Sequence, residues 1–165
     1  MRIAQIYEGT NGVQALDSVG RKLPAFTGRY LRHFFHPILA FIKEHENNED
    51  LAELIPGLAK AVGRFQQATS YLAVTALRNA DEGGAASVDY LKFFALVSHA
   101  YLWARAVLIA KGKLGQGEDL FYQGKIDTAR FFYAKLLPQT SSLLANIMGG
   151  AKPLMSIPDE AFGPF

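Results

Sequence analysis

The residues with the clearest potential for chemistry lie near the start of the chain, in the run QIYEGTNG. Glu8 is a carboxylate of the kind that serves as a general base, and Gly9 beside it lets the backbone pass close to another surface. Thr10 or Asn11 is suited to cap a helix that begins near Gly12. A carboxylate in this setting predicts either a catalytic base or an ordinary capped turn with a solvent-facing glutamate.

The elements that must position Glu8 are helices. Apolar residues recur at steps of three and four through four long segments, residues 27–45, 51–80, 88–111 and 119–148. This spacing is typical of helices that pack at shallow angles, and a shorter helical segment, residues 13–23, follows Glu8. The sequence therefore predicts an all-α fold: an up-and-down four-helix bundle preceded by a short helix, with an extended C-terminal arm.

Polar and glycine-rich stretches predict where the long helices end. Residues 46–50 (ENNED) form a polar turn after the first long helix. Residues 81–84 (DEGG) are expected to end the second, with glycine supplying a left-handed cap, and Ser87 is expected to cap the third. Three glycines within residues 112–117 predict a flexible link before the fourth.

Prolines divide the helical pattern further. Pro37 and Pro138 fall inside predicted helices, where each removes a backbone donor and should kink or restart its helix. Pro56 also falls inside such a pattern but suits a first turn. Residues 149–165 hold three prolines and three glycines among scattered apolar residues. This composition predicts an arm that packs on a surface, such as that of a neighbouring subunit.

Composition limits the class of protein. The 165 residues are 50% hydrophobic and 19% charged, with a net charge of +2, so the chain can bury a core and has no strong attraction for nucleic acid. The zero cysteines exclude disulfides and thiolate metal sites and fit a reducing compartment. No secretory signal opens the sequence, and charged residues interrupt the apolar region 88–109. We therefore predict a cytoplasmic protein without a membrane span.

The opening residues also resemble a known family. The run IYEGT at residues 6–10, followed by Gln14 and an amphipathic helix, resembles the catalytic-base segment of the acyl-CoA dehydrogenases. Residues 2–22 are similar to the longer bacterial branch of that family, which includes dehydrogenases of short acyl-CoAs and of methylthiopropanoyl-CoA. That branch continues into an added helical domain. Residues 25–150 resemble this domain, and residues 151–165 resemble its terminal arm.

The resemblance implies catalysis by Glu8. In these FAD-dependent enzymes a glutamate takes the α-proton of the acyl-CoA thioester while the flavin takes the β-hydride, and Glu8 matches that base. A glutamate near its reference pKa of about 4.3 is too weak for this task, and expulsion of water by the acyl chain should raise its pKa. Gly9 would let the substrate approach. Thr10 and Asn11 would contact the flavin through donors. Gly12 would do so through its backbone alone, because family members often carry glutamine there.

The resemblance also divides the chain and implies its partners. Residues 1–24 would be the end of the catalytic domain, residues 25–150 the helical bundle domain and residues 151–165 the arm. Because Glu8 stands so early, we expect the C-terminal portion of a longer enzyme, inactive by itself and holding little or no FAD. The complete enzyme would act on acyl-CoA, pass electrons to electron-transfer flavoprotein and form a homo-oligomer. The alternative is a stand-alone helical dimerisation or interaction module without catalysis.

Two further groups of residues could serve a function. Arg29, Arg32, His33 and His36 share one helix face. They suit either phosphate or acidic-partner binding or a solvated face paired with nearby acids, and the solvated face is favoured. His99 is expected in the core or at an interface. The bundle segments contain no Glu-x-x-His pair, so no di-iron site is predicted.

Aromatic residues exceed the needs of one core. The runs at residues 93–94 and 131–133 place rings on more than one helix face, which predicts a subunit or interdomain surface. Trp103 is expected in the core.

Overall fold

A computed structural model describes residues 10–163, apart from the side chains of Phe26 and Thr27, and every regular element in that range is helical. The α-helices are α1 (Asn11–Asp17), α2 (Ala25–Glu44), α3 (Ile55–Arg78), α4 (Ala80–Lys111), α5 (Asp119–Phe131), α6 (Thr140–Met148) and α7 (Lys152–Met155). Five-residue π-helical turns follow α1 (Ser18–Lys22) and α5 (Phe132–Leu136). Short 3-10 turns lie at Glu49–Leu51, Leu137–Gln139 and Asp159–Phe162. The predicted all-α class is confirmed.

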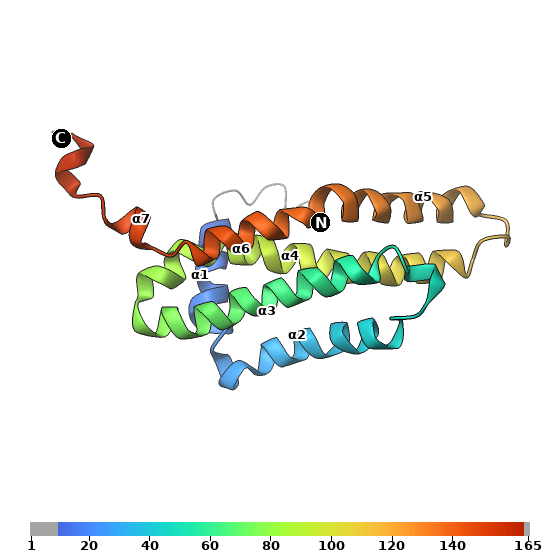
Figure 1. Cartoon of the computed structure of the whole chain (residues 1–165), viewed down its shortest axis with the longest axis horizontal. Coiled ribbons are helices and arrows are strands. Elements are labelled where there is room, and N and C mark those ends of the chain that lie inside the picture. The colour runs from blue at the N-terminus through green and yellow to red at the C-terminus, as the bar shows by residue number, and fades with distance from the viewer. Residues whose placement is uncertain (1–9, 164–165) are drawn as a thin grey trace.

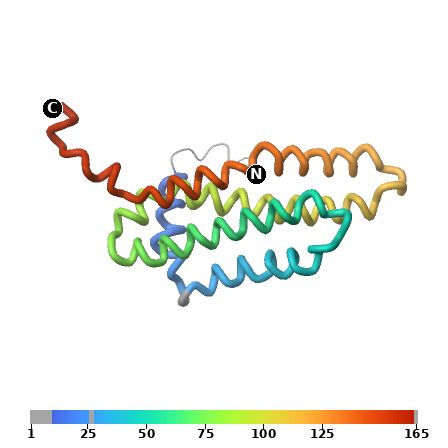
Figure 2. The backbone as a smooth tube through the Cα atoms, viewed as in Figure 1, coloured from blue at the N-terminus to red at the C-terminus, as the bar shows by residue number. Residues whose placement is uncertain are grey.

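The long helices form an up-and-down bundle. Helices α2, α3 and α4 run back and forth along the long axis of the molecule, and α5 continued by α6 forms the fourth rod (Figure 1). Figure 2 shows that the N-terminal helix α1 crosses one end of the bundle, while the C-terminal segment leaves the body at the same end. The predicted bundle, with a short helix before it, is therefore the observed fold.

The predicted seam of the second long helix is the centre of the core. Of its eight positions, the last, Ala76, is half-buried, and the other seven are buried: Leu51, Ile55, Leu58, Val62, Phe65, Thr69 and Leu72. Burying a large apolar side chain contributes about 1.5–3 kcal/mol to the free energy of unfolding. The three-and-four spacing of these residues therefore fixes which face of α3 turns inward.

Helix α4 occupies the middle of the bundle and is apolar on several faces. Its buried residues contact α3 on one side and α5 and α6 on another, and they include Phe93, Val97, Ala100 and Ala104. In the described part of the chain, α4 is the one helix long and apolar enough to cross a membrane. About a third of its most apolar 18-residue stretch is buried. The central helix of a bundle meets the same criterion, and α4 holds that position.

The boundary between α3 and α4 differs from the sequence prediction. Asn79 alone separates the two helices, and its side-chain oxygen accepts a hydrogen bond from the Asp81 amide, at 3.0 Å, as the N-cap of α4. The predicted turn at residues 81–84 lies inside α4, and so does the predicted cap Ser87. The sequence interpretation was wrong because Gly83 serves packing: a Cβ there would lie 3.3 Å from the Cβ of Ala76.

The prolines act differently at their three positions. Pro56 lies in the first turn of α3, as the sequence suggested. Pro138 lies in the 3-10 turn that separates the π-helical turn after α5 from α6, so the predicted restart of the fourth helix is confirmed. Helix α2 instead continues without a break through Pro37, which is exposed.

The arm begins at a glycine that no other residue replaces easily. Gly150 has a φ of 71°, and a Cβ there would lie 2.9 Å from the carboxylate of Glu82. Beyond it the chain projects from the body (Figure 1), and up to residue 163 it leaves four large apolar side chains exposed: Leu154, Met155, Ile157 and Phe162. The arm is not fully extended, because Pro153 sits in the first turn of the short helix α7.

Candidate functional site

The predicted site residues fall at the edge of the described structure. Glu8 and Gly9 lie outside the described residues. Thr10 is half-buried and occupies the N-cap position of α1, but its side chain makes no capping hydrogen bond. Asn11 and Gly12 are exposed in the first turn of that helix. The structure thus places Thr10, Asn11 and Gly12 together on the surface.

The helix that follows these residues is anchored to the bundle. Ala15 and Val19 are buried on its inner face. On its outer face the carboxylate of Asp17 accepts hydrogen bonds from Arg21 and pairs with the Lys22 ammonium at 3.0 Å. The hydrogen bond from Arg21, and then that from Lys22, lowers the pKa of Asp17 to about 2. The side chain of Lys22 is thereby held near the mouth of the cavity described next.

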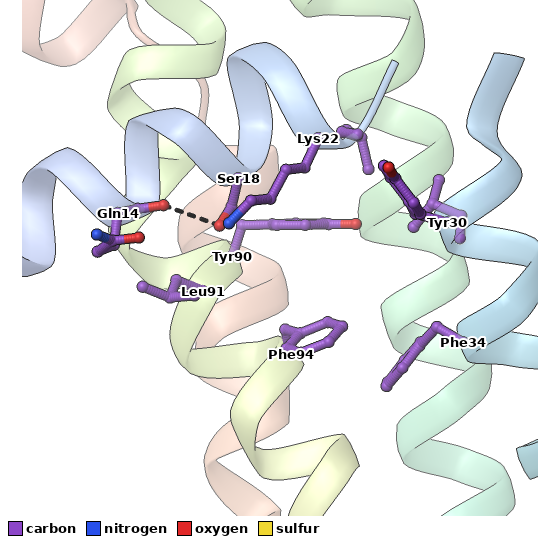
Figure 3. Close-up of a pocket in the computed structure, with 10 residues that line it drawn as sticks. Gln14, Ser18, Lys22, Tyr30, Phe34, Tyr90, Leu91 and Phe94 are labelled. Carbon is purple, nitrogen blue, oxygen red and sulfur yellow. Dashed lines mark hydrogen bonds between the residues drawn. The ribbon is translucent and has the colours of Figure 1, made fainter. Parts of the chain in front are cut away.

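A cavity of about 370 Å³ lies where α1 and its π-helical continuation cross α2 and α4. It is lined by Gln14, Ser18, Lys22, Leu23, Tyr30, Leu31, Phe34, Tyr90, Leu91 and Phe94. Figure 3 shows the rings of Phe34 and Phe94 on one side and the polar side chains of Gln14, Ser18 and Lys22 on the other. Concave, mostly apolar sites with a few polar groups are the usual form of small-molecule sites.

The floor of this cavity is made of aromatic rings. The rings of Phe34 and Phe94 are 4.4 Å apart between centroids and tilted by 31°. Tyr90 is buried, and its hydroxyl shares a 2.8 Å hydrogen bond with Thr69. Burial raises the pKa of Tyr90 to about 12. Tyr90 therefore offers its ring to the cavity, and its hydroxyl stays neutral and bonded on the far side.

The polar rim carries binding groups. The Ser18 hydroxyl donates to the Gln14 carbonyl at 2.8 Å, as the dashed line in Figure 3 marks, and Lys22 lines the same cavity. Such a cavity suits a ligand with an apolar body and a hydrogen-bonding end. Among the described residues that line it, none is a carboxylate or a histidine.

Sequence reasoning missed this cavity. The four-residue spacing of Tyr90 and Phe94 in the periodic segment 88–111 predicts that both rings face the core, whereas Phe94 is 38% exposed and its ring packs against that of Phe34. The available signal was the aromatic pair at residues 93–94, of which one ring must turn away from the core. Phe93 is fully buried, so Phe94 is the ring left for the cavity.

The other predicted groups have simple surroundings. The Arg29 guanidinium donates to the His33 ring at 3.4 Å. His99 is exposed, with its ring 6.1 Å from that of Phe132, and Trp103 is half-buried against the core. Within residues 10–163, no three His, Asp or Glu side chains cluster as a metal site would require.

Comparisons with known proteins agree with this helical architecture. Residues 34–158 match the sequence model of a family described as acetyl-CoA dehydrogenase C-terminal like. The chain is 33% identical over 143 residues to the 3-methylmercaptopropionyl-CoA dehydrogenase of Ruegeria pomeroyi, covering 86% of this chain and 24% of that protein. It is 30% identical to the broad-specificity linear acyl-CoA dehydrogenase FadE5 of Mycobacterium tuberculosis, covering 98% and 28% of the two chains. It is 26% identical to the butyryl-CoA dehydrogenase of Syntrophomonas wolfei, covering 98% and 27%.

The matched residues 34–158 make up about three quarters of the chain, and this match establishes the class of protein. The chain belongs to the family of acetyl-CoA dehydrogenase C-terminal-like domains, and the resemblance predicted from the sequence is confirmed. The chain spans about a quarter of the length of the curated relatives it matches.

Proposed function

We propose that this chain is the base-bearing C-terminal portion of an FAD-dependent acyl-CoA dehydrogenase. That enzyme would remove hydrogen from the α and β carbons of an acyl-CoA thioester, with Glu8 as the general base. In this proposal residues 1–24 end the catalytic domain, residues 25–150 are the added bundle and residues 151–165 are the arm. The isolated chain would be inactive.

The observation that carries the proposal is the extent of the similarity. The match to two acyl-CoA dehydrogenases covers 98% of this chain, so it includes the segment that holds Glu8 as well as the bundle. The structure adds support, because α1 follows that segment at once and is anchored through Ala15 and Val19.

The chemistry requires a carboxylate that becomes a stronger base when the substrate binds. A thioester α-proton is a weak acid, and a glutamate surrounded by water is a poor base for it. An acyl chain that excludes water around Glu8 would raise the pKa of its carboxyl, since burial disfavours the charged form. When bound, FAD supplies the acceptor for the β-hydride. Gly9 would leave room for the substrate beside the base.

The residues proposed to touch the flavin have space for it but form only part of a site. Nothing lies within 4 Å of the position that a Cβ would take at Gly12, and Asn11 is exposed beside it. Thr10, Asn11 and Gly12 do not line the cavity between α1, α2 and α4. A flavin in contact with them would need further residues to hold it, so we expect the purified chain to be colourless. A yellow, flavin-loaded preparation of the chain would contradict this.

The decisive test is the substitution Glu8→Gln in the complete dehydrogenase. Loss of the base should lower the rate of acyl-CoA dehydrogenation by a factor of about 10²–10⁴, while the flavin absorbance of the purified enzyme stays unchanged. Asp17→Asn is the matched control, because it makes the same carboxylate-to-amide change one helix away and breaks only exposed ion pairs. Retained turnover in Glu8→Gln would remove Glu8 from the mechanism.

The remaining parts of the proposal concern the complete enzyme. Electron-transfer flavoprotein would reoxidise the flavin, the enzyme would be a cytoplasmic homo-oligomer, and the exposed rings of Phe121 and Phe131 would lie at subunit or domain contacts. Crosslinking and sedimentation of the complete enzyme test the oligomer directly.

A further inference from the structure

Helices α2 and α3 carry a strong excess of positive charge. Their sequences contain six Lys or Arg residues, namely Arg29, Arg32, Lys43, Lys60, Arg64 and Arg78. They contain a single acid, Glu44, at the last position of α2. The whole chain has a net charge of only +2, so the remaining elements are acidic by comparison. A field of this kind favours the approach of anions to this side of the bundle.

Between these two helices runs an open groove of about 430 Å³. It is lined by Gly28, Leu31, Arg32, Phe35, His36, Leu39, Gln66, Thr69 and Ser70. The two cationic or protonatable side chains come from α2, and the amide and hydroxyl groups come from α3. The folded chain thus brings together groups that lie about 35 positions apart in the sequence.

The polar side chains that line the groove come from both of its walls. Arg32 and His36 are one helical turn apart on α2, and both are exposed. On α3, Gln66 and Ser70 hold the same spacing and are also exposed. Thr69 between them bonds inward to the Phe65 carbonyl and to Tyr90, so its hydroxyl serves the core. The groove therefore presents a guanidinium, an imidazole, an amide and a hydroxyl.

The floor of the groove is apolar. Leu31, Phe35 and Leu39 lie along it, with Phe35 buried and Leu39 exposed. At Gly28, where the groove begins, the backbone has a φ of 72°, a conformation that favours glycine and leaves no side chain over that end. A ligand with a carbon skeleton or a flat ring would rest on this floor while its charged end met the walls.

We propose that the α2–α3 groove binds phosphate esters whose organic part is apolar or aromatic. A phosphate has several acceptor oxygens and up to two negative charges, so it suits a planar guanidinium together with neutral donors better than a single carboxylate does. This site goes beyond the proposed dehydrogenase function, because none of the described residues proposed for that function, Thr10, Asn11 and Gly12, lines the groove. The ligand could be a soluble nucleotide or the headgroup of a phospholipid, since both offer the same chemistry.

The first experiment is a titration of the 165-residue chain with ADP, followed by backbone amide NMR. ADP should shift the amides of Arg32, His36, Gln66 and Ser70, and adenosine, which lacks phosphate, should shift them little. Shifts that map to another part of the bundle, or equal effects of ADP and adenosine, would overturn the proposal.

Variants then separate a built site from general attraction to positive charge. Arg32→Gln should weaken ADP binding by about tenfold, the effect of losing one charge-assisted hydrogen bond. Lys113→Gln is the matched control, because it removes one exposed charge in the link between α4 and α5. His36→Gln provides a second test if Arg32→Gln disturbs folding. If Arg32→Gln and Lys113→Gln weakened ADP binding equally, the binding would come from general attraction to positive charge, and the proposed site would be refuted.

The source of the phosphate is decided by a second probe. Vesicles of phosphatidylcholine with added phosphatidic acid are tested for co-sedimentation of the chain, with vesicles of phosphatidylcholine alone as control. Binding of ADP without vesicle binding identifies a soluble ester, and vesicle binding that Arg32→Gln abolishes identifies a lipid headgroup. Absence of binding to both probes contradicts the proposal.

Discussion

The two ends of helix α4 are held in different ways. In its N-terminal half, the rings of Phe93 and Tyr90 pack against that of Phe65, with centroid distances of 5.0 Å and 4.8 Å. Near its C-terminal half, the core is a smaller cluster of aliphatic side chains: Leu51, Leu54, Ile55, Val107, Ala110, Ile126 and Ala129. We call these the aromatic end and the aliphatic end.

Polar groups follow the same division. At the aromatic end the buried Tyr90 hydroxyl bonds to Thr69, deep between α3 and α4. At the aliphatic end the polar contacts lie outside: Arg130 holds Glu53 through two hydrogen bonds of 2.8 Å and 3.0 Å, and Lys111 pairs with Asp50 at 3.3 Å. Because exposed ion pairs contribute little and buried aromatic packing contributes much, we expect the aromatic end to dominate stability.

The largest effect should come from Phe65→Ala. Phe65 is fully buried, and its ring contacts five other aromatic rings. Its truncation should lower the free energy of unfolding by about 3–5 kcal/mol, which is the usual cost of a large cavity. Urea unfolding measures this, and Phe121→Ala is the control because Phe121 is exposed on α5. Equal losses of unfolding free energy in the two variants would contradict the distinction between core and surface rings.

The aliphatic end should respond next. Ile126 is 3% exposed and packs in the smaller cluster. Ile126→Ala should cost about 2–4 kcal/mol, since fewer contacts are lost than with a phenyl ring. The same urea experiment applies. A loss greater than that of Phe65→Ala would show that the aliphatic end carries the fold.

The buried tyrosine at the aromatic end should give a smaller, pH-dependent effect. Tyr90→Phe removes the bond to Thr69 and should cost about 1 kcal/mol at neutral pH. Burial raises the pKa of Tyr90 to about 12 from its usual 10, so the stability due to the neutral hydroxyl is complete below pH 10 and is lost as pH rises through 12. The difference between wild type and Tyr90→Phe should therefore shrink over that alkaline window. A difference that is constant from pH 9 to pH 12 would contradict the burial of this hydroxyl.

The smallest effect should come from the ion pair at the aliphatic end, and it should appear at acid pH. The hydrogen bond from Arg130 lowers the pKa of Glu53. A lowered pKa adds stability above the ordinary glutamate range, and this stability is lost as pH falls below it. Glu53→Gln should therefore leave the urea midpoint nearly unchanged at neutral pH and flatten its decline in acid. Glu160→Gln in the exposed arm serves as the control.

The sequence predicted the bundle well because the bundle depends on periodicity. Every seam residue of α3 from Ile55 to Leu72 is buried as its spacing required. The junction between α3 and α4 was mispredicted because a glycine can mark either a turn or a close contact, and only the position of Ala76 shows which applies to Gly83. The continuous course of α2 through Pro37 likewise depends on neighbouring helices that spacing does not describe.

The candidate site was predictable in part. The run at residues 6–10 pointed to the family, which the comparison of residues 34–158 confirms. The roles of Glu8 and its neighbours stay predictions. The cavity beside α1 escaped the sequence because it forms where three helices cross, and the side chains of Phe34 and Phe94 meet there from different helices. Distances between helices cannot be read from any single periodic pattern.

The single-residue joint at Asn79 has a practical consequence for anyone who adds a probe to this protein. Helices of 24 and 32 residues meet there with one residue between them, so an inserted tag would have to break the Asn79 cap or push the two rods apart. The link at residues 112–118 has glycines with φ of 82° and 106° and only exposed residues. A fluorophore or an affinity tag belongs in that link, where added residues would extend into solvent without displacing a helix.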